Sequence, residues 1–174
     1  SLQPTSDGLT AENAPFVGVL FAGLRLTLDG PQVLEFNCRF GDPEAQVVLP
    51  LLESDLVEVI EACLDGNLDQ AEVKWHTGAA ATVVAASEGY PDSYPKGRTI
   101  EGIADANALE NAVVFQAGTY QTDADTLVTN GGRVLTITGW GATLAQAVSQ
   151  AYTGMDKICF EGIHFRRDIG AKAL

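Results

Sequence analysis

One short stretch of the sequence concentrates polar side chains that could do chemistry together. It begins at Glu35 and reads Glu-Phe-Asn-Cys-Arg-Phe-Gly-Asp-Pro-Glu. Because side chains alternate between the two faces of an extended strand, Glu35, Asn37 and Arg39 are expected on one face, at steps of about 7 Å. The apolar residues between them fall on the other face, which is expected to pack on a core. The polar face therefore presents a carboxylate, an amide oxygen and a guanidinium in a row.

The residue types in this row suit the binding of a metal ion and a phosphate. Mg²⁺ prefers hard oxygen ligands, takes few of them from the protein, and fills its remaining positions with phosphates and water. Glu35 and Asn37 would supply two such oxygens, and Arg39 could hold a phosphate or carboxylate through paired hydrogen bonds. These groups fit phosphoryl transfer, in which positioning and charge neutralisation do most of the work. Spacing alone leaves a second interpretation open, in which the same residues form a solvated sheet face.

Two further carboxylates, Asp42 and Glu44, follow where the strand is expected to give way to a helix. Asp42 can cap that helix and Pro43 suits its first position, so a short helix is predicted over residues 44–52. Backbone N–H groups at a helix start attract anions, while the two carboxylates could orient a cationic amine. Both residues are therefore candidate substrate contacts.

The sequence upstream predicts the hairpin that must position this stretch. Residues 16–27 are almost wholly apolar, which predicts a strand buried on both faces. The dipeptide Asp29-Gly30 predicts a hairpin turn into a return strand over residues 33–40.

Downstream, the pattern predicts a mixed α+β chain. A helix is predicted over residues 56–64, with Ser54 or Asp55 as its cap. The texture changes near residues 65–75 and becomes β-rich, with one long helix predicted over 143–157 from apolar residues at helical spacing. Thr143 can cap that helix, with Gln146 completing a capping box. The strands predicted in this part span residues 80–87, 112–118, 126–130, 133–139 and 163–166.

Composition excludes several classes of protein. The net charge of −13 argues against binding duplex nucleic acid, which needs clustered Lys and Arg. Three cysteines without a C-x-x-C spacing indicate neither a disulfide framework nor a zinc site. No apolar run approaches the ~18 residues of a spanning helix and no signal peptide is visible, so no membrane partner and a cytoplasmic location are expected. His76 and His164 are far apart in sequence and are not predicted to bind a metal.

The stretch that begins at Glu35, together with pieces along the whole chain, closely resembles the phosphoribosylamine–glycine ligases (glycinamide ribonucleotide synthetases). The Glu-Phe-Asn-x-Arg-Phe-Gly-Asp-Pro-Glu core is highly specific, whereas the later pieces are individually weak and jointly strong. The matching pieces span residues 18–24, 29–31, 33–44, 48–52, 54–56, 87–91, 96–97, 114–119, 131–135 and 160–170.

The resemblance implies an ATP-grasp ligase that joins glycine to 5-phosphoribosylamine while ATP becomes ADP and phosphate. Such ligases first phosphorylate a carboxylate, here to glycyl phosphate, which the amine of phosphoribosylamine then attacks. By the match of motif, Glu35 and Asn37 resemble the residues that bind Mg²⁺ or Mn²⁺ and, through it, ATP. Arg39 resembles the catalytic arginine that faces the phosphoryl group, and Arg39, Asp42 and Glu44 resemble substrate contacts.

The resemblance also implies how the fold is organised. Residues 1–68 would be the C-terminal part of an ATP-grasp domain, a β-hairpin plus helices, and residues 69–174 a small β-rich C-terminal domain with one long helix. The nucleotide-clamping subdomains of the family have no counterpart here, so we expect the chain to need the upstream part of the same polypeptide and to be inactive alone. Gln116 stands where the family has His, and Arg25 where it has Met. An amide at position 116 can hydrogen-bond much as an imidazole does.

Two rival hypotheses are open on the sequence alone. One is another ATP-grasp carboxylate–amine ligase or carboxylase, whose C-terminal domains are similar. The other is a non-catalytic β-rich interaction module that kept the hairpin for structure. The Arg-Phe-Gly-Asp-Pro-Glu run favours the glycine ligase, and a pure scaffold has no need of two hard ligands, Glu35 and Asn37, on one face.

Overall fold

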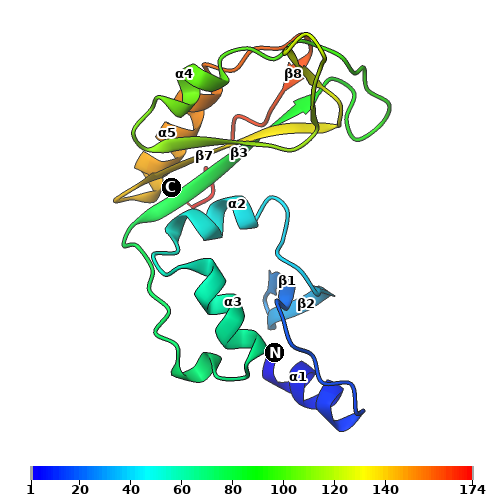
Figure 1. Ribbon diagram of the computed structural model, residues 1–174, viewed down its shortest axis with the longest axis vertical. Helices are drawn as coiled ribbons and strands as arrows, with labels where there is room; N and C mark the ends of the chain where they lie inside the picture. Colours follow the sequence, from blue (N-terminus) through cyan, green and yellow to red (C-terminus); the bar gives the residue numbers. More distant parts are fainter. Residues whose placement is uncertain (1, 174) are drawn as a thin grey trace. The chain divides into compact units, whose positions relative to one another are not determined.

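The computed structural model describes residues 2–173, which divide into two compact units (Figure 1). The hairpin unit holds the residues up to Ala45 together with Leu52–Trp75. The sheet unit holds Gln46–Leu51 together with the residues from His76 onward. The predicted domain division after residue 68 stays a prediction, because compact units need not coincide with folding domains. No helix among the described residues is long and apolar enough to cross a membrane.

The hairpin unit is built around one antiparallel pair of strands. The pairing runs from Phe21 opposite Asn37 to Thr27 opposite Gly30, so the connection is a two-residue turn just before Gly30. The return strand therefore begins and ends three residues earlier than predicted. The elements of this unit are α1 (Leu2–Ala11), β1 (Phe21–Thr27), β2 (Gly30–Asn37), α3 (Leu56–Leu64) and the 3₁₀ turn η2 (Leu68–Gln70).

The prediction that the first strand is buried on both faces is wrong. Leu26 is 83% exposed and Leu24 49%, and on β2 Phe36 is 41% exposed. The reason is that β1 and β2 form a sheet of only two strands within the described chain, and a two-stranded hairpin cannot cover its own faces. The expected core under the apolar face of β2 is likewise absent from the described residues.

The helices around residue 50 agree with the sequence in part. Helix α3 has the predicted bounds, and Asp55 caps it by accepting a 2.7 Å hydrogen bond from the Val57 N–H. The preceding helix was predicted to start at Pro43, which is wrong. Pro43 lies in a turn that the Ala45 N–H closes by donating to the Gly41 carbonyl at 2.9 Å. The helix, α2 (Ala45–Val48), starts after this turn and tightens into the 3₁₀ turn η1 (Leu49–Leu51).

The sheet unit contains a four-stranded antiparallel sheet in the order β4-β7-β3-β8. Its main strands are those that the sequence predicted, while the short helix α4 and the two-residue-scale strand β5 were not predicted because neither carries a clear apolar period. The elements are β3 (Ala79–Ser87), α4 (Ile103–Asn107), β4 (Ala112–Gln116), β5 (Thr119–Gln121), β6 (Leu127–Thr129), β7 (Arg133–Gly141), α5 (Leu144–Met155) and β8 (Ile163–His164).

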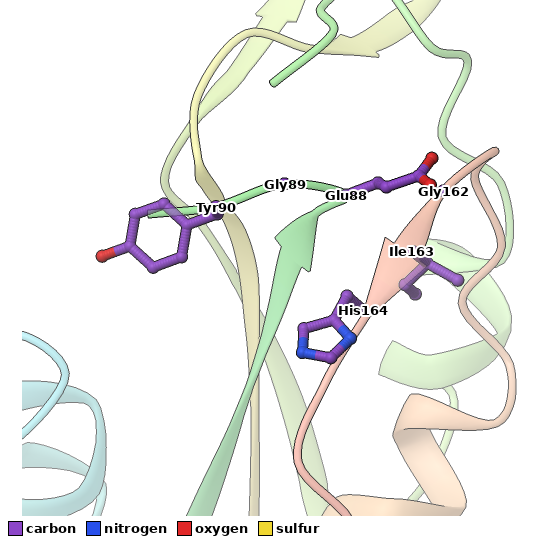
Figure 2. Close-up of a pocket in the computed structure, with 6 residues that line it drawn as sticks. All are labelled: Glu88, Gly89, Tyr90, Gly162, Ile163 and His164. Carbon is purple, nitrogen blue, oxygen red and sulfur yellow. The ribbon is translucent and has the colours of Figure 1, made fainter. Parts of the chain in front are cut away.

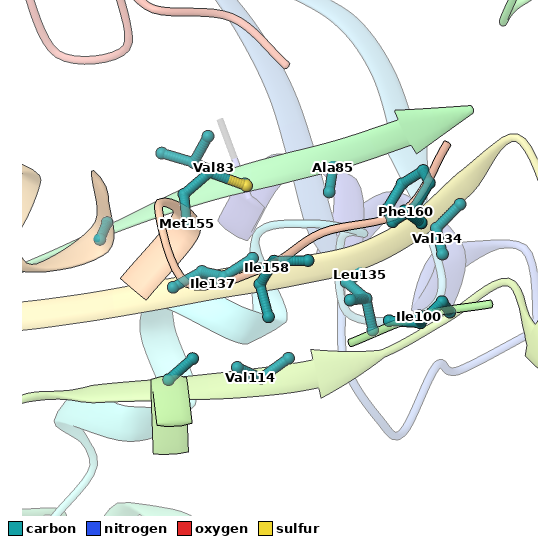
Figure 3. Packing of buried hydrophobic residues seen from close by; sticks show 12 residues of the cluster. Val83, Ala85, Ile100, Val114, Val134, Leu135, Ile137, Met155, Ile158 and Phe160 are labelled. Atoms are coloured by element: carbon teal, nitrogen blue, oxygen red, sulfur yellow. The ribbon is translucent and has the colours of Figure 1, made fainter. Parts of the chain in front are cut away.

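Helix α5 covers one face of this sheet and closes the core (Figure 3). The predicted cap is present, with the Thr143 hydroxyl accepting from the Gln146 N–H at 3.3 Å. Ile137 and Met155 are almost fully buried where strand and helix meet. The approach is close because Gly139 has no side chain: a Cβ there would meet the Ala151 nitrogen and lie 2.6 Å from the Ala147 carbonyl oxygen.

Replacing Gly139 by alanine should therefore separate α5 from the sheet. We expect a loss of about 1–3 kcal/mol in the free energy of unfolding, the usual cost of overpacking a core. Urea denaturation followed by circular dichroism measures this loss. Gly8→Ala is the control, because nothing lies within 4 Å of a Cβ at that helical position. An unchanged midpoint for Gly139→Ala would contradict the packing described for α5.

The segment after β8 returns along α5 and is fastened by one side chain. The Tyr152 hydroxyl donates to the Arg166 carbonyl at 2.8 Å and accepts from the Ile169 N–H at 3.1 Å. Next to this contact the Arg166 guanidinium donates two hydrogen bonds, of 2.8 and 2.6 Å, to the two carboxylate oxygens of Asp168. These bonds favour the ionised carboxylate and lower the pKa of Asp168 below its ordinary value.

Arg166→Gln should raise the pKa of Asp168 towards its ordinary value. Because the pKa is lowered in the folded state, the stabilisation from this exposed pair is present above the ordinary carboxyl pKa and is lost as the pH falls through the lowered one. A ¹³C NMR titration of the carboxyl carbon checks the shift. Lys172→Gln is the matched control, since Lys172 contributes least to the lowering and its loss should move the pKa less. Equal effects of the two variants would refute the bidentate pair.

Candidate functional site

The two predicted metal ligands lie side by side at the end of β2. Glu35 and Asn37 share one face of the strand, and the Asn37 Nδ2 group donates a 3.0 Å hydrogen bond to Glu35 Oε1. Glu35 is exposed and Asn37 is half-buried. The sequence therefore predicted their common face correctly, and the structure adds that their polar atoms are in direct contact.

The opposite strand leaves room for this pair. Gly23 is the cross-strand partner of Glu35, and a Cβ at Gly23 would lie 3.1 Å from Glu35 Cγ. The register shifts immediately beyond, so that Leu24 pairs with Val33 and Leu34 is an extra residue on β2. Such a bulge increases local twist and re-aims neighbouring side chains. The bulge and the missing side chain together give the Glu35 carboxylate its space.

Arg39 does not continue this row. Strand β2 ends at Asn37, two residues before it, so the prediction that three side chains line one strand face is wrong for Arg39. The exposed guanidinium instead donates from Nη1 to the Phe40 carbonyl at 2.8 Å. The chain bends at this point because it must enter the turn around Pro43. Arg39 lies near the pair in sequence but is oriented by its own backbone.

The two further carboxylates lie in that turn. Asp42 and Glu44 are both exposed, and the Glu44 side chain folds over Gly41, where an added Cβ would meet its carboxylate. A glycine at this position therefore lets the turn close under Glu44. The structure places both carboxylates next to Arg39 along the chain, without a printed contact among the three side chains.

The donor set of the pair fits a hard divalent cation. A carboxylate and an amide carbonyl are both oxygen ligands of the kind that Mg²⁺ and Mn²⁺ accept. Rotation of the Asn37 amide by half a turn exchanges its nitrogen for its oxygen and would present two oxygens on the same side. The described residues contain no group of three or more His, Cys, Asp or Glu side chains that could hold a metal. A cation at Glu35 and Asn37 would thus rely on phosphates and water for its other ligands.

A second place of interest lies at one end of the sheet unit, where glycine-rich turns meet. The Ser87 hydroxyl donates to the Gly131 carbonyl at 2.9 Å, and Gly118 and Gly131 approach so closely that neither could carry a side chain. Gln116 accepts a 3.0 Å hydrogen bond from the Thr119 hydroxyl, as an amide in place of an imidazole was expected to do. Sequence reasoning noted these turns individually but gave no signal that they converge.

A hollow of about 460 Å³ opens beside these turns (Figure 2). Its lining includes the side chains of Glu88, Tyr90 and His164 and the backbone of Gly162. The sequence did not point to His164 as a functional residue, because only strand pairing brings it next to the turn that follows β3.

Comparison with protein-family models gives two matches. Residues 1–45 match the model described as the ATP-grasp (A) domain of phosphoribosylglycinamide synthetase, and residues 80–172 match the C domain of the same synthetase. The first match places the stretch around Glu35 in an ATP-grasp domain. Because the second match covers more than half of the chain, the chain belongs to the phosphoribosylglycinamide synthetase family.

Individual relatives agree with this assignment. The bifunctional purine biosynthetic protein purD of Dictyostelium discoideum is 51% identical over 180 residues, which cover 99% of this chain and 22% of that protein. A phosphoribosylamine–glycine ligase of Synechocystis is 49% identical over 175 residues, covering 99% and 41%. The crystal structure of the phosphoribosylamine–glycine ligase of Thermotoga maritima has a TM-score of 0.79 at 37% identity, covering 92% and 39%. The chain spans less than half the length of each of these proteins.

The contact between Glu35 and Asn37 should depend on the glycine opposite. Gly23→Ala is expected to push Glu35 aside and lengthen its hydrogen bond to Asn37, because the new Cβ would be closer to Glu35 Cγ than ordinary van der Waals contact allows. The side-chain NH₂ signals of Asn37 in an ¹⁵N NMR spectrum should shift, whereas Gly8→Ala should leave them in place. Unmoved signals in Gly23→Ala would show that Gly23 does not shape the pair.

Proposed function

We propose that this chain is part of an ATP-dependent ligase that joins glycine to 5-phosphoribosylamine and yields glycinamide ribonucleotide, ADP and phosphate. The observation that carries the proposal is the Glu35–Asn37 contact inside the segment that matches an ATP-grasp domain. The printed names of the relatives support the choice of glycine and phosphoribosylamine as substrates over those of other ATP-grasp ligases. The cytoplasmic location remains a prediction.

Each residue of the hairpin has a part in the proposed reaction. Glu35 and Asn37 would hold Mg²⁺ or Mn²⁺, which when bound neutralises the phosphates of ATP during transfer of the terminal phosphoryl group. Transfer to the carboxylate of glycine forms glycyl phosphate and releases ADP. The amine of phosphoribosylamine then attacks the carbonyl carbon, and phosphate leaves.

Arg39 is the proposed catalytic residue. Its guanidinium can bind the transferred phosphoryl group and then the acyl phosphate through two parallel hydrogen bonds. For this it exchanges its 2.8 Å bond to the Phe40 carbonyl for bonds to the substrate, which is a small rearrangement of an exposed side chain. The adjacent carboxylates of Asp42 and Glu44 are the proposed contacts for the cationic or hydrogen-bonding amine groups of the substrates.

The hairpin unit also supports the proposal that an upstream part of the same polypeptide is required. A hollow of about 290 Å³ in this unit is lined almost entirely by apolar atoms, and the neighbouring strands expose large apolar side chains. Exposed apolar area of this kind marks a surface that another segment covers. The much greater length of the relatives supplies such a segment. The lining consists of Gly18, Val19, Phe40, Leu56, Val59, Ile60, Cys63, Leu64 and Leu68.

The proposal is tested in the natural full-length gene product with Glu35→Gln. We expect glycine-dependent release of ADP, measured with Mg²⁺, ATP and phosphoribosylamine generated in situ, to fall by about 100-fold or more, as when a ligand or charge-stabilising group is removed. Glu58→Gln is the matched control, since Glu58 is an exposed glutamate on α3 in the same unit. Raising the Mg²⁺ concentration should partly restore the variant.

The outcomes separate the rival hypotheses. Glycine-dependent release that survives in Glu35→Gln would keep the ligase and remove Glu35 as an essential metal ligand. ADP release without glycine dependence, in an enzyme shown to be folded, would point to another ATP-grasp substrate. The absence of any ATP turnover in the folded full-length protein would favour the interaction module.

A further inference from the structure

A bulge at the start of β7 turns one arginine away from the core. Along β7 the residues paired with β3 alternate regularly until Leu135, which pairs with Ala85, but Ala86 pairs with Arg133, so Val134 is an extra residue. Val134 and Leu135 are both fully buried in the core under α5 (Figure 3). Two successive residues on the core side are what such a bulge produces. Arg133 therefore emerges on the face opposite α5, beside Ala86.

A histidine reaches the same face from the other side of β3. Strand β8 pairs Ile163 with Ser87 and His164 with Ala86. Ile163 packs against the core, so the next residue, His164, must point to the opposite face. Arg133, Ala86 and His164 thus form a row across three neighbouring strands, about 10 Å from end to end at the Cα atoms. The alanine methyl between them leaves the space above it open.

An aromatic hydroxyl completes the set. The Tyr90 ring lies flat against the backbone of Gly132, where a side chain would collide with it, and Gly132 immediately precedes Arg133. Tyr90 and His164 line the same hollow, and Figure 2 shows both rings on one side of the end of β3. The carboxylate of Glu88, which also lines the hollow, is turned the other way, over Gly162.

We propose that this hollow binds the phosphate group of a sugar phosphate. A guanidinium, an imidazole N–H and a phenol O–H around a small floor are the donors that recognise a phosphate monoester, and the arginine can bind two of its oxygens at once. Glu88 at the rim accepts hydrogen bonds, as the hydroxyls of a sugar require. That the sugar phosphate is phosphoribosylamine rests on the proposed function, whereas binding of a phosphate monoester does not.

The two histidines of the chain make a direct test possible. The imidazole signals of the 174-residue chain are followed by NMR during titration with ribose 5-phosphate, ribose and inorganic phosphate. Ribose 5-phosphate should shift the signals of His164 saturably and leave those of His76 unchanged. Arg133→Gln should weaken its affinity by about tenfold or more, the loss expected for one charge-assisted contact. Arg25→Gln, an exposed arginine of the hairpin unit, is the matched control.

Tyr90→Phe provides a second variant should Arg133→Gln unfold, and it should weaken binding without loss of the aromatic packing on Gly132. Equal shifts of both histidines, or affinity unchanged in both variants, would overturn the site. Equal binding of inorganic phosphate and ribose 5-phosphate would overturn the assignment to a sugar phosphate. Binding by this chain can succeed while the full-length protein shows no glycine-dependent ADP release, so failure of the proposed function is distinguishable from failure of the site.

Discussion

Strand pairing decides where every chemically interesting side chain of this molecule points, and both candidate sites sit where that pairing is interrupted. In an antiparallel pair, side chains alternate strictly unless one strand carries an extra residue. The hairpin unit has such a residue at Leu34, next to Glu35, and the sheet unit has one at Val134, next to Arg133. At each bulge a glycine or alanine on the neighbouring strand leaves room, namely Gly23 and Ala86. The local geometry of both sites thus follows from the same device.

The sequence predicted the elements of the sheet unit well because their signals are local. Period-two runs gave β3 and β7, and the Thr143 cap with apolar residues at helical spacing gave α5. The cap at Asp55 was equally readable. The bulge at Val134 was not, because Val134-Leu135 is an apolar pair within a run that reads as an ordinary buried strand. The place of His164 beside Arg133 depends on pairing between distant strands, which no local pattern contains.

In the hairpin unit the sequence predicted the common face of Glu35 and Asn37 and missed what surrounds it. An almost wholly apolar strand indicates burial on both faces, yet pattern alone does not say which segment supplies the cover. Leu24 and Leu26 are exposed because no further strand of the described chain pairs with β1 or packs on it. Arg39 was misplaced for a different reason, since the bend into the turn at Pro43 ends the strand before the alternation reaches it.

Charge explains why so few residues carry the proposed chemistry. A chain with a net charge of −13 and only ten Lys and Arg repels anions over most of its surface, whereas ATP and a sugar phosphate are both anionic. Affinity must then come from local groups that outweigh the general field: a divalent cation held by Glu35 and Asn37, and donors fixed by strand geometry, as at Arg133. Acidic residues such as Asp42, Glu44 and Glu88 beside those groups add no attraction for phosphate. They are suited instead to the amine and hydroxyl groups of the substrates, so the acidic surface separates the two ends of a phosphorylated amine by charge.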